Sequence, residues 1–152
     1  MHQDSIPSRR QSGVTLLELL IVVVIVAIIS AFAYPSYTQY VVNTKRTAAT
    51  SALLQIADRQ QQFFMDNKTF AANLTNLGLA ANPMFISDDG RSVAAGDDEA
   101  VYLLTLAGVA PTTYTAIAAP LAGQLARDTD CGTLTLNQAG VRDALGGGDD
   151  CW

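Results

Sequence analysis

One carboxylate stands where an ionised side chain is costly to keep. Glu18 lies near the start of a segment that is apolar from residue 19 to 29 and again from 31 to 33. Burying an unpaired ionised carboxylate in lipid costs about 3 kcal/mol or more. An acid retained in a membrane-spanning helix indicates a function and a partner. Glu18 is therefore a candidate functional residue, and its chemistry requires a positively charged group nearby.

Other residue combinations do not suggest catalysis. The single histidine, His2, precedes the apolar segment, and no nucleophile with a base and an acid can be assembled after it. Two clusters of adjacent carboxylates lie in segments typical of turns and lack the spacing of an EF-hand loop. We therefore expect solvated acidic loops at Asp88, Asp89, Asp97, Asp98 and Glu99. The sequence predicts no catalytic residue, no metal site, no cofactor and no enzymatic activity.

Length and charge define the class of protein further. The chain has 152 residues, is 49% hydrophobic and carries a formal net charge of −5, which suits one small domain with an attached apolar segment. The basic residues form no stripe that would neutralise successive phosphates: Arg9, Arg10, Lys45, Arg46, Arg59, Lys68, Arg91, Arg127 and Arg142. We therefore do not expect the bulk of the chain to bind nucleic acid.

The apolar segment is long enough to cross a membrane. As a helix, residues 14–34 extend about 30 Å, the thickness of the hydrocarbon core. Arg9 and Arg10 precede the segment and the next cations come well after it, so the N-terminus is expected in the cytoplasm. The triplet at residues 31–33 would also suit the cleavage site of a secretory signal, but the pattern beyond it favours a continuing helix.

Beyond residue 34 the sequence turns amphipathic. Apolar side chains recur at a spacing close to 3.6, namely at Ala49, Ala52, Leu53, Ile56, Phe63 and Phe64. This pattern predicts one helix from about residue 14 to about residue 66, with its first half in lipid and its second half packed on a domain. Pro35 lies at the junction, where we expect a kink or a local loss of helix.

The remainder of the sequence predicts a small sheet. Leu74, Leu77 and Leu79 indicate a loop or short helical turn laid on the long helix. Three strands follow at residues 101–106, 113–118 and 132–137, and the last two alternate between apolar and polar side chains. Such strands form an antiparallel sheet with one buried face. The predicted fold class is α+β, with the long N-terminal helix packed on this sheet.

Cys131 and Cys151 both follow the predicted membrane crossing and would therefore lie in an oxidising space. We interpret them as a disulfide, which would close a flexible, polar loop and contribute about 3 kcal/mol. The alternative, a redox or metal-binding pair, lacks the close cysteine spacing and the nearby histidine that such sites need.

These features together resemble a known family. The N-terminal motif resembles the class III signal of type IV prepilins and pseudopilins, with a basic leader in front of it: Gly13-Val14-Thr15-Leu16-Leu17-Glu18-Leu19. Pro35, the long helix, the sheet and the cysteine-bounded loop extend the likeness over nearly the whole chain. Residues 131–140 with Cys151 and Trp152 resemble the PilE-type minor pilins in particular. The chain departs from the family in having Val14 where phenylalanine is usual.

The resemblance implies how the chain is processed. Gly13 would be the last residue of the leader removed by prepilin peptidase, and Val14 would become the N-methylated terminus. Its amine would supply the partner of Glu18, since the family pairs this carboxylate with the terminal amine of a neighbouring subunit. Removal of the leader, with Asp4, Arg9 and Arg10, changes the net charge from −5 to −6.

The expected organisation is a leader at 1–13, a transmembrane and assembly helix at 14–35, and a globular pilin domain at 36–152. The expected function is a structural subunit of a type IV pilus, a minor pilin that supports assembly, twitching motility and adhesion. Expected partners are other pilins, prepilin peptidase, the inner-membrane assembly machinery and, before assembly, membrane lipid. The chain would lie in the bacterial inner membrane and then in the pilus at the cell surface. The alternatives are a major pilin, a type II secretion pseudopilin, or a membrane-anchored periplasmic binding module.

Overall fold

The computed structural model describes residues 13–152, so most of the predicted leader, including Arg9 and Arg10, lies outside the described residues. Its main helix, α1, spans Leu16–Asn67 and contains 52 residues, which confirms the predicted long helix. The helix continues through Pro35, so the local loss of helix that we considered is not found. The alternative outcome, a kink at Pro35, remains a prediction.

Residue contacts divide the chain into two units, Met1–Thr38 and Gln39–Trp152. In the first unit, the side chains of residues 13–34 are all exposed, although nearly all of them are apolar. The α1 helix is long and apolar enough in this part to cross a membrane, judged by its length and composition.

The second unit contains a six-stranded antiparallel sheet of order β2-β1-β3-β4-β5-β6. Its long strands, β3 (Tyr102–Ala110) and β4 (Thr113–Pro120), and the shorter β5 (Leu134–Asn137) confirm the three predicted strands. Along β4, Tyr114 is buried while Thr113 is exposed, as the alternation predicts. The predicted helical turn after α1 is the short 3-10 helix η1, Thr75–Leu77.

Four short elements had no clear pattern in the sequence. They are β1 (Met84–Ile86), β2 (Ser92–Val93), the helix α2 (Ala122–Leu125) and β6 (Arg142–Ala144). The strands among them have two or three residues and the helix has four, about one turn, which is too short to show a period in each case. The three short strands form by pairing with neighbours in the sheet: β1 pairs with β3, β2 with β1, and β6 with β5.

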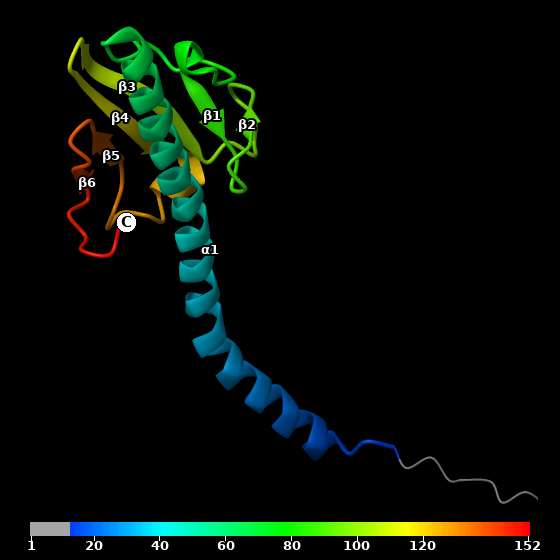
Figure 1. Cartoon of the computed structure of the whole chain (residues 1–152). Coiled ribbons are helices and arrows are strands. Elements are labelled where there is room, and N and C mark those ends of the chain that lie inside the picture. The colour runs from blue at the N-terminus through cyan, green and yellow to red at the C-terminus, as the bar shows by residue number, and fades with distance from the viewer. Residues whose placement is uncertain (1–12) are drawn as a thin grey trace, which may run out of the picture. The chain divides into compact units, whose positions relative to one another are not determined.

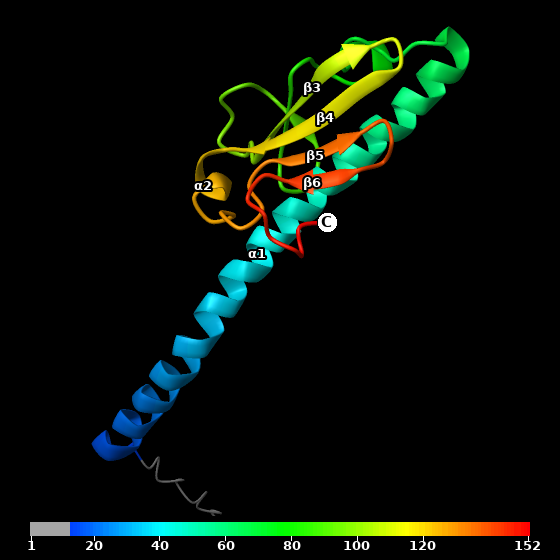
Figure 2. The same cartoon turned by 90° about the vertical axis from the view of Figure 1, so that its left-hand side faces the viewer.

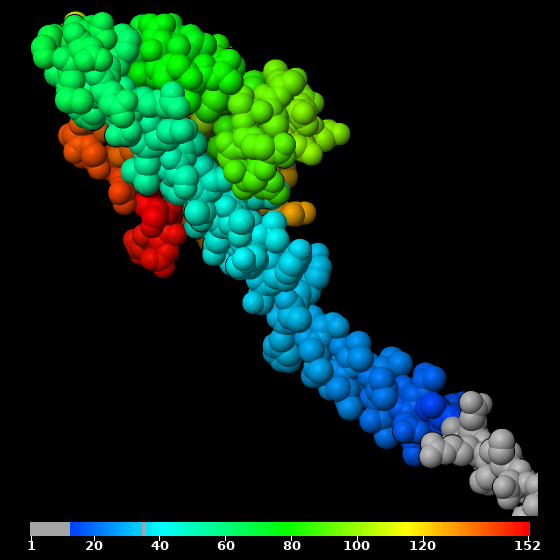
Figure 3. All heavy atoms as spheres, turned by 45° about the vertical axis from the view of Figure 1, so that its right-hand side comes forward, coloured from blue at the N-terminus to red at the C-terminus, as the bar shows by residue number. Residues whose placement is uncertain are grey.

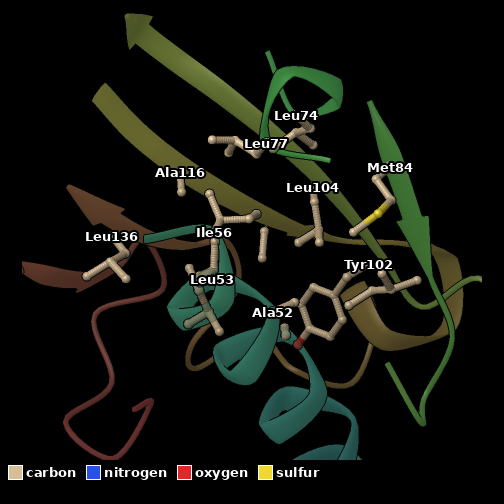
Figure 4. Close-up of a cluster of buried hydrophobic side chains, with 14 of the residues drawn as sticks. Ala52, Leu53, Ile56, Leu74, Leu77, Met84, Tyr102, Leu104, Ala116 and Leu136 are labelled. Carbon is tan, nitrogen blue, oxygen red and sulfur yellow. The ribbon is translucent and has the colours of Figure 1, made fainter. Parts of the chain in front are cut away.

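The hydrophobic core lies between the sheet and the part of α1 in the second unit, which crosses one face of the sheet (Figures 1 and 2). Leu53 and Ile56 of α1 are fully buried and lie close to Leu104 and Ala116 of the sheet (Figure 4). The predicted apolar face of the helix is confirmed by its buried members, Ala49, Ala52, Leu53 and Ile56, with Phe63 and Phe64 partly buried beside them. The α+β fold class is therefore confirmed.

Candidate functional site

The start of α1 is defined by a side-chain cap. The backbone N–H of Glu18 donates a hydrogen bond to the hydroxyl of Thr15 at 3.2 Å, and the N–H of Leu19 bonds the Thr15 carbonyl at 3.2 Å. Threonine followed three residues later by glutamate is a pattern that starts helices. The helix accordingly begins at Leu16, and Gly13 and Val14 lie before it.

Glu18 lies in the first turn of α1 and is exposed. Within residues 13–152, its carboxylate forms no hydrogen bond and no ion pair. The positive end of the helix dipole favours a carboxylate in this turn. Val14, four positions earlier, is 72% exposed. The structure thus leaves the Glu18 carboxylate available for a partner outside the described chain.

The C-terminal segment is closed by the predicted disulfide. Cys131 and Cys151 are bonded, with an S–S distance of 2.02 Å and 5.4 Å between their Cα atoms. Backbone hydrogen bonds add to this link: Gly146 N–H donates to Cys131 at 3.0 Å, and Gly148 N–H donates to Asp130 at 2.8 Å. The segment after β6 is therefore fastened along the residues that precede and follow Cys131.

A buried polar cluster lies beside this segment. The Asp128 carboxylate is fully buried and accepts two hydrogen bonds from the Arg46 guanidinium, from Nε at 3.1 Å and from Nη2 at 2.6 Å. The same carboxylate also accepts from the Tyr102 hydroxyl at 3.1 Å and from Gln124 Nε2 at 3.1 Å. Such a charged group is tolerated in a core because its hydrogen-bonding capacity is used.

The cluster raises the pKa of two of its members, Arg46 and Tyr102. The hydrogen bonds to Asp128 raise the pKa of Arg46 above its ordinary value, which keeps the guanidinium charged. Burial raises the pKa of the Tyr102 hydroxyl well above 10, so the phenol stays neutral and donates to the carboxylate. Arg46 therefore stays cationic beside the Asp128 side chain, with a neutral tyrosine next to it.

Sequence reasoning missed this cluster. In the sequence, Arg46 counts only as one of the scattered basic residues, and no partner is predicted for it. In the structure its side chain is 11% exposed and pairs with Asp128. A signal was present, because Arg46 continues the buried spacing of Val42, Ala49 and Leu53 along α1. A charged residue on the apolar face of a helix predicts a buried counter-ion.

The acidic loops have a different organisation. In the turn between β1 and β2, Asp89 accepts hydrogen bonds from Ser87 and Arg91, and Arg91 also lies 3.7 Å from Glu99 in the loop between β2 and β3. These hydrogen bonds, from Ser87 first and then from Arg91, lower the pKa of Asp89 from 3.8 to about 2. Among the described residues, no group of three or more histidine, cysteine, aspartate or glutamate side chains could hold a metal ion.

Comparisons with known proteins connect these features to a family. A family model described as "Type IV minor pilin ComP, DNA uptake sequence receptor" matches residues 35–135, and a model of the prokaryotic N-terminal methylation motif matches residues 8–34. A solved structure described as a type IV pilin from Shewanella oneidensis is 20% identical, with a TM-score of 0.44. The match covers 70% of this chain and 92% of that one. No curated protein sequence matches the chain.

The family match confirms the resemblance to type IV minor pilins and favours a minor pilin over the alternatives that the sequence left open. A pilin is a structural subunit and not an enzyme. Since residues 35–135 are more than half of the sequence, this chain belongs to the ComP family of type IV minor pilins.

Proposed function

We propose that this minor pilin is cut between Gly13 and Val14 by prepilin peptidase and is then N-methylated at Val14. The observation that carries the proposal is the methylation motif over residues 8–34, together with the helix start at Leu16. Cleavage occurs most readily in exposed backbone outside regular structure. Gly13 and Val14 are exposed and precede the helix, so the bond between them meets this requirement.

The new terminus would supply the partner of Glu18. An α-amino group is positively charged at neutral pH, whereas Val14 carries no charge before cleavage. When a subunit leaves lipid for the filament, pairing of Glu18 with the amine of a neighbouring subunit neutralises both charges. A buried pair of this kind fixes the register of subunits more than it adds net stability. Other pilins and the inner-membrane assembly machinery are the partners that this step needs.

The proposed topology places the N-terminus in the cytoplasm and the unit Gln39–Trp152 outside it. Arg9 and Arg10 precede the apolar segment, which agrees with the positive-inside rule. The disulfide of the second unit suits an oxidising compartment. After assembly the chain would lie in the pilus, where it supports pilus formation, twitching and adhesion.

Intact-mass measurement of the chain from membranes and from sheared fibres tests the processing. We expect a mature form that begins at Val14 with one added methyl group. Gly13→Leu should remain at precursor length, because a bulky side chain replaces the hydrogen of glycine at the scissile bond, and Gly13→Ala serves as the conservative control. A mature form of the wild type that begins elsewhere would contradict the proposal.

We propose participation in DNA uptake as a second candidate function, because the matched family model is described as a DNA uptake sequence receptor. The charge of the chain limits this role. Arg46 and Arg91 are held in ion pairs, while Lys45 and Arg127 form no ion pair with residues 13–152. Few cations are therefore available for phosphates, so DNA binding should depend only weakly on salt. Each phosphate contact makes the slope of log affinity against log salt more negative by about 0.9.

Binding of labelled DNA duplexes to the full chain in detergent, at low and at physiological salt, tests the DNA-uptake role. A receptor role predicts that one duplex sequence binds more tightly than scrambled duplexes of equal length, and that Lys45→Gln or Arg127→Gln weakens this binding. If no duplex binds at either salt concentration, the DNA role is contradicted and the expectation from the scattered cations holds.

A further inference from the structure

Arg46 contacts both of the segments that carry the cysteines. Its Nε and Nη2 atoms bond the side chain of Asp128, three residues before Cys131. Its Nη1 atom donates to the backbone carbonyl of Asp150, directly before Cys151, at 3.1 Å. One guanidinium of α1 therefore links the segment that precedes Cys131 to the segment that precedes Cys151.

One side of this bridge is firmly held. Besides Arg46, the Asp128 carboxylate binds Tyr102 of β3 and Gln124 of α2, and Gln124 Nε2 also lies 3.2 Å from the Val42 carbonyl of α1. All of these side chains except that of Arg46 belong to fully or almost fully buried residues. The buried Asp128 carboxylate consequently orients the Arg46 guanidinium without any contact from the C-terminal segment.

Within the described chain, the other side, the C-terminal segment, is held by backbone hydrogen bonds only as far as Gly148. The segment passes through Gly146, Gly147 and Gly148, and glycine restricts the backbone less than any other residue. Beyond Gly148, the indole of Trp152 donates to the carbonyl of Asp143 in β6 at 3.1 Å and packs against the hydrophobic core. The bond from Arg46 to Asp150 ties the last residues to α1, against which they lie in the space-filling view (Figure 3).

We propose that Arg46 is a positioning residue for the Cys131–Cys151 disulfide: it holds the reduced C-terminal segment so that Cys151 lies against Cys131. The proposal concerns the reduced chain, before the bond exists. A guanidinium suits this task because its planar fork binds a carboxylate through two atoms and leaves a third for a carbonyl.

The reaction that it assists is thiol–disulfide exchange with an external disulfide, here glutathione disulfide. The thiolate of Cys131 attacks one glutathione sulfur, forms a mixed disulfide and releases one glutathione thiolate. The thiolate of Cys151 then attacks Sγ of Cys131 and releases the second. The protein loses two electrons and two protons, and one glutathione disulfide becomes two thiols. Arg46 raises the probability of the second attack by keeping the two cysteines together.

The test is a redox titration of the full chain in detergent, in glutathione buffers of graded composition, with the free thiols alkylated by a maleimide polymer and counted by gel shift. Cys131 and Cys151 are the only cysteines, so the readout is unambiguous. The variants are Arg46→Gln and Arg46→Lys. Gln60→Met is the matched control, because Gln60 is a buried polar residue of α1 whose hydrogen bonds go to Ala71, away from the disulfide.

We expect the equilibrium constant for disulfide formation to fall about tenfold in Arg46→Gln, the size of effect expected for a lost hydrogen bond to a charged group. Arg46→Lys should lie between this variant and the wild type, since an ammonium group can bind Asp128 without also reaching Asp150. Gln60→Met should lower the melting temperature and leave the constant within about twofold, because a loss common to both redox states cancels.

A constant for folded Arg46→Gln within twofold of the wild type would overturn the proposal. If Arg46→Gln does not fold, Arg46→Lys decides by the same criterion. Failure of both variants to fold, even when oxidised, would also overturn it, since Arg46 would then be required for the fold as a whole and not for closing the disulfide.

Discussion

The Thr15 hydroxyl and the Glu18 backbone N–H are joined by a hydrogen bond of 3.2 Å, and this contact determines where the long helix begins. Loss of a threonine cap costs about 1 kcal/mol. We therefore expect Thr15→Val, which keeps the shape of the side chain, to speed amide exchange at Glu18 about fivefold in detergent micelles. Thr15→Ser retains the hydroxyl and should match the wild type. Equal exchange in all three proteins would exclude the cap.

Gln60 holds the loop after α1 to the helix. Its side-chain carbonyl accepts from the Ala71 N–H at 2.8 Å and its amide donates to the Ala71 carbonyl at 3.0 Å. Gln60→Met leaves both buried backbone groups unsatisfied and should lower the free energy of unfolding by about 1 to 3 kcal/mol. The control is Gln62→Met on the exposed side of α1, and thermal melts of the two should differ. Coincident melts would count against this role.

Gly146 allows close backbone contact in the C-terminal segment. A Cβ atom at this position would overlap the Asp130 carbonyl, whereas a Cβ at Gly123 would meet nothing within 4 Å. Gly146→Ala should therefore destabilise the oxidised protein by about 1 to 3 kcal/mol. Gly123→Ala, in α2, should have little effect. Denaturant unfolding of both variants measures the difference, and an unchanged midpoint for Gly146→Ala would refute the contact.

Asp89 should titrate well below an ordinary aspartate. Its pKa is lowered from 3.8 to about 2, first by the Ser87 hydroxyl and then by Arg91. Because the folded value lies below the unfolded one, the contribution of Asp89 to stability is complete above about pH 4 and is lost as the pH falls through about 2. Carboxyl chemical shifts give the titration directly. Ser87→Ala should move the pKa upward, and an unchanged value would contradict the assignment.

The sequence predicted the parts of this fold that carry a long period or a specific motif. The α1 helix shows its period over many residues, and strands β4 and β5 alternate between apolar and polar side chains. The cysteine pair follows from the predicted compartment, and the disulfide is present. Short strands such as β2 depend on pairing with neighbours already in place, which no local pattern records.

The Arg46–Asp128 pair illustrates why part of the site escaped prediction. The two residues are 82 positions apart, and although Arg46 continues the buried spacing of α1, nothing in the local sequence marks Asp128 as its partner. Only the packing of α2 and β3 around Asp128 makes the carboxylate buried and so makes its partner necessary. Glu18 could be identified from the sequence because the residues that follow it are apolar, and a charge in such a segment is costly.

The central claim is that Glu18 serves assembly through a charge pair with the Val14 amine. Glu18→Gln keeps the size of the side chain and removes the charge, so processing should be normal while incorporation falls. Asp66→Asn, which neutralises another exposed carboxylate of α1, is the matched control.

The most direct measurement is the ratio of this chain in sheared fibres to the chain in membranes, quantified by mass spectrometry for the wild type and both variants. The account predicts at least a tenfold lower ratio for Glu18→Gln, with a normal mature N-terminus, and an unchanged ratio for Asp66→Asn. A wild-type ratio in processed Glu18→Gln would contradict it.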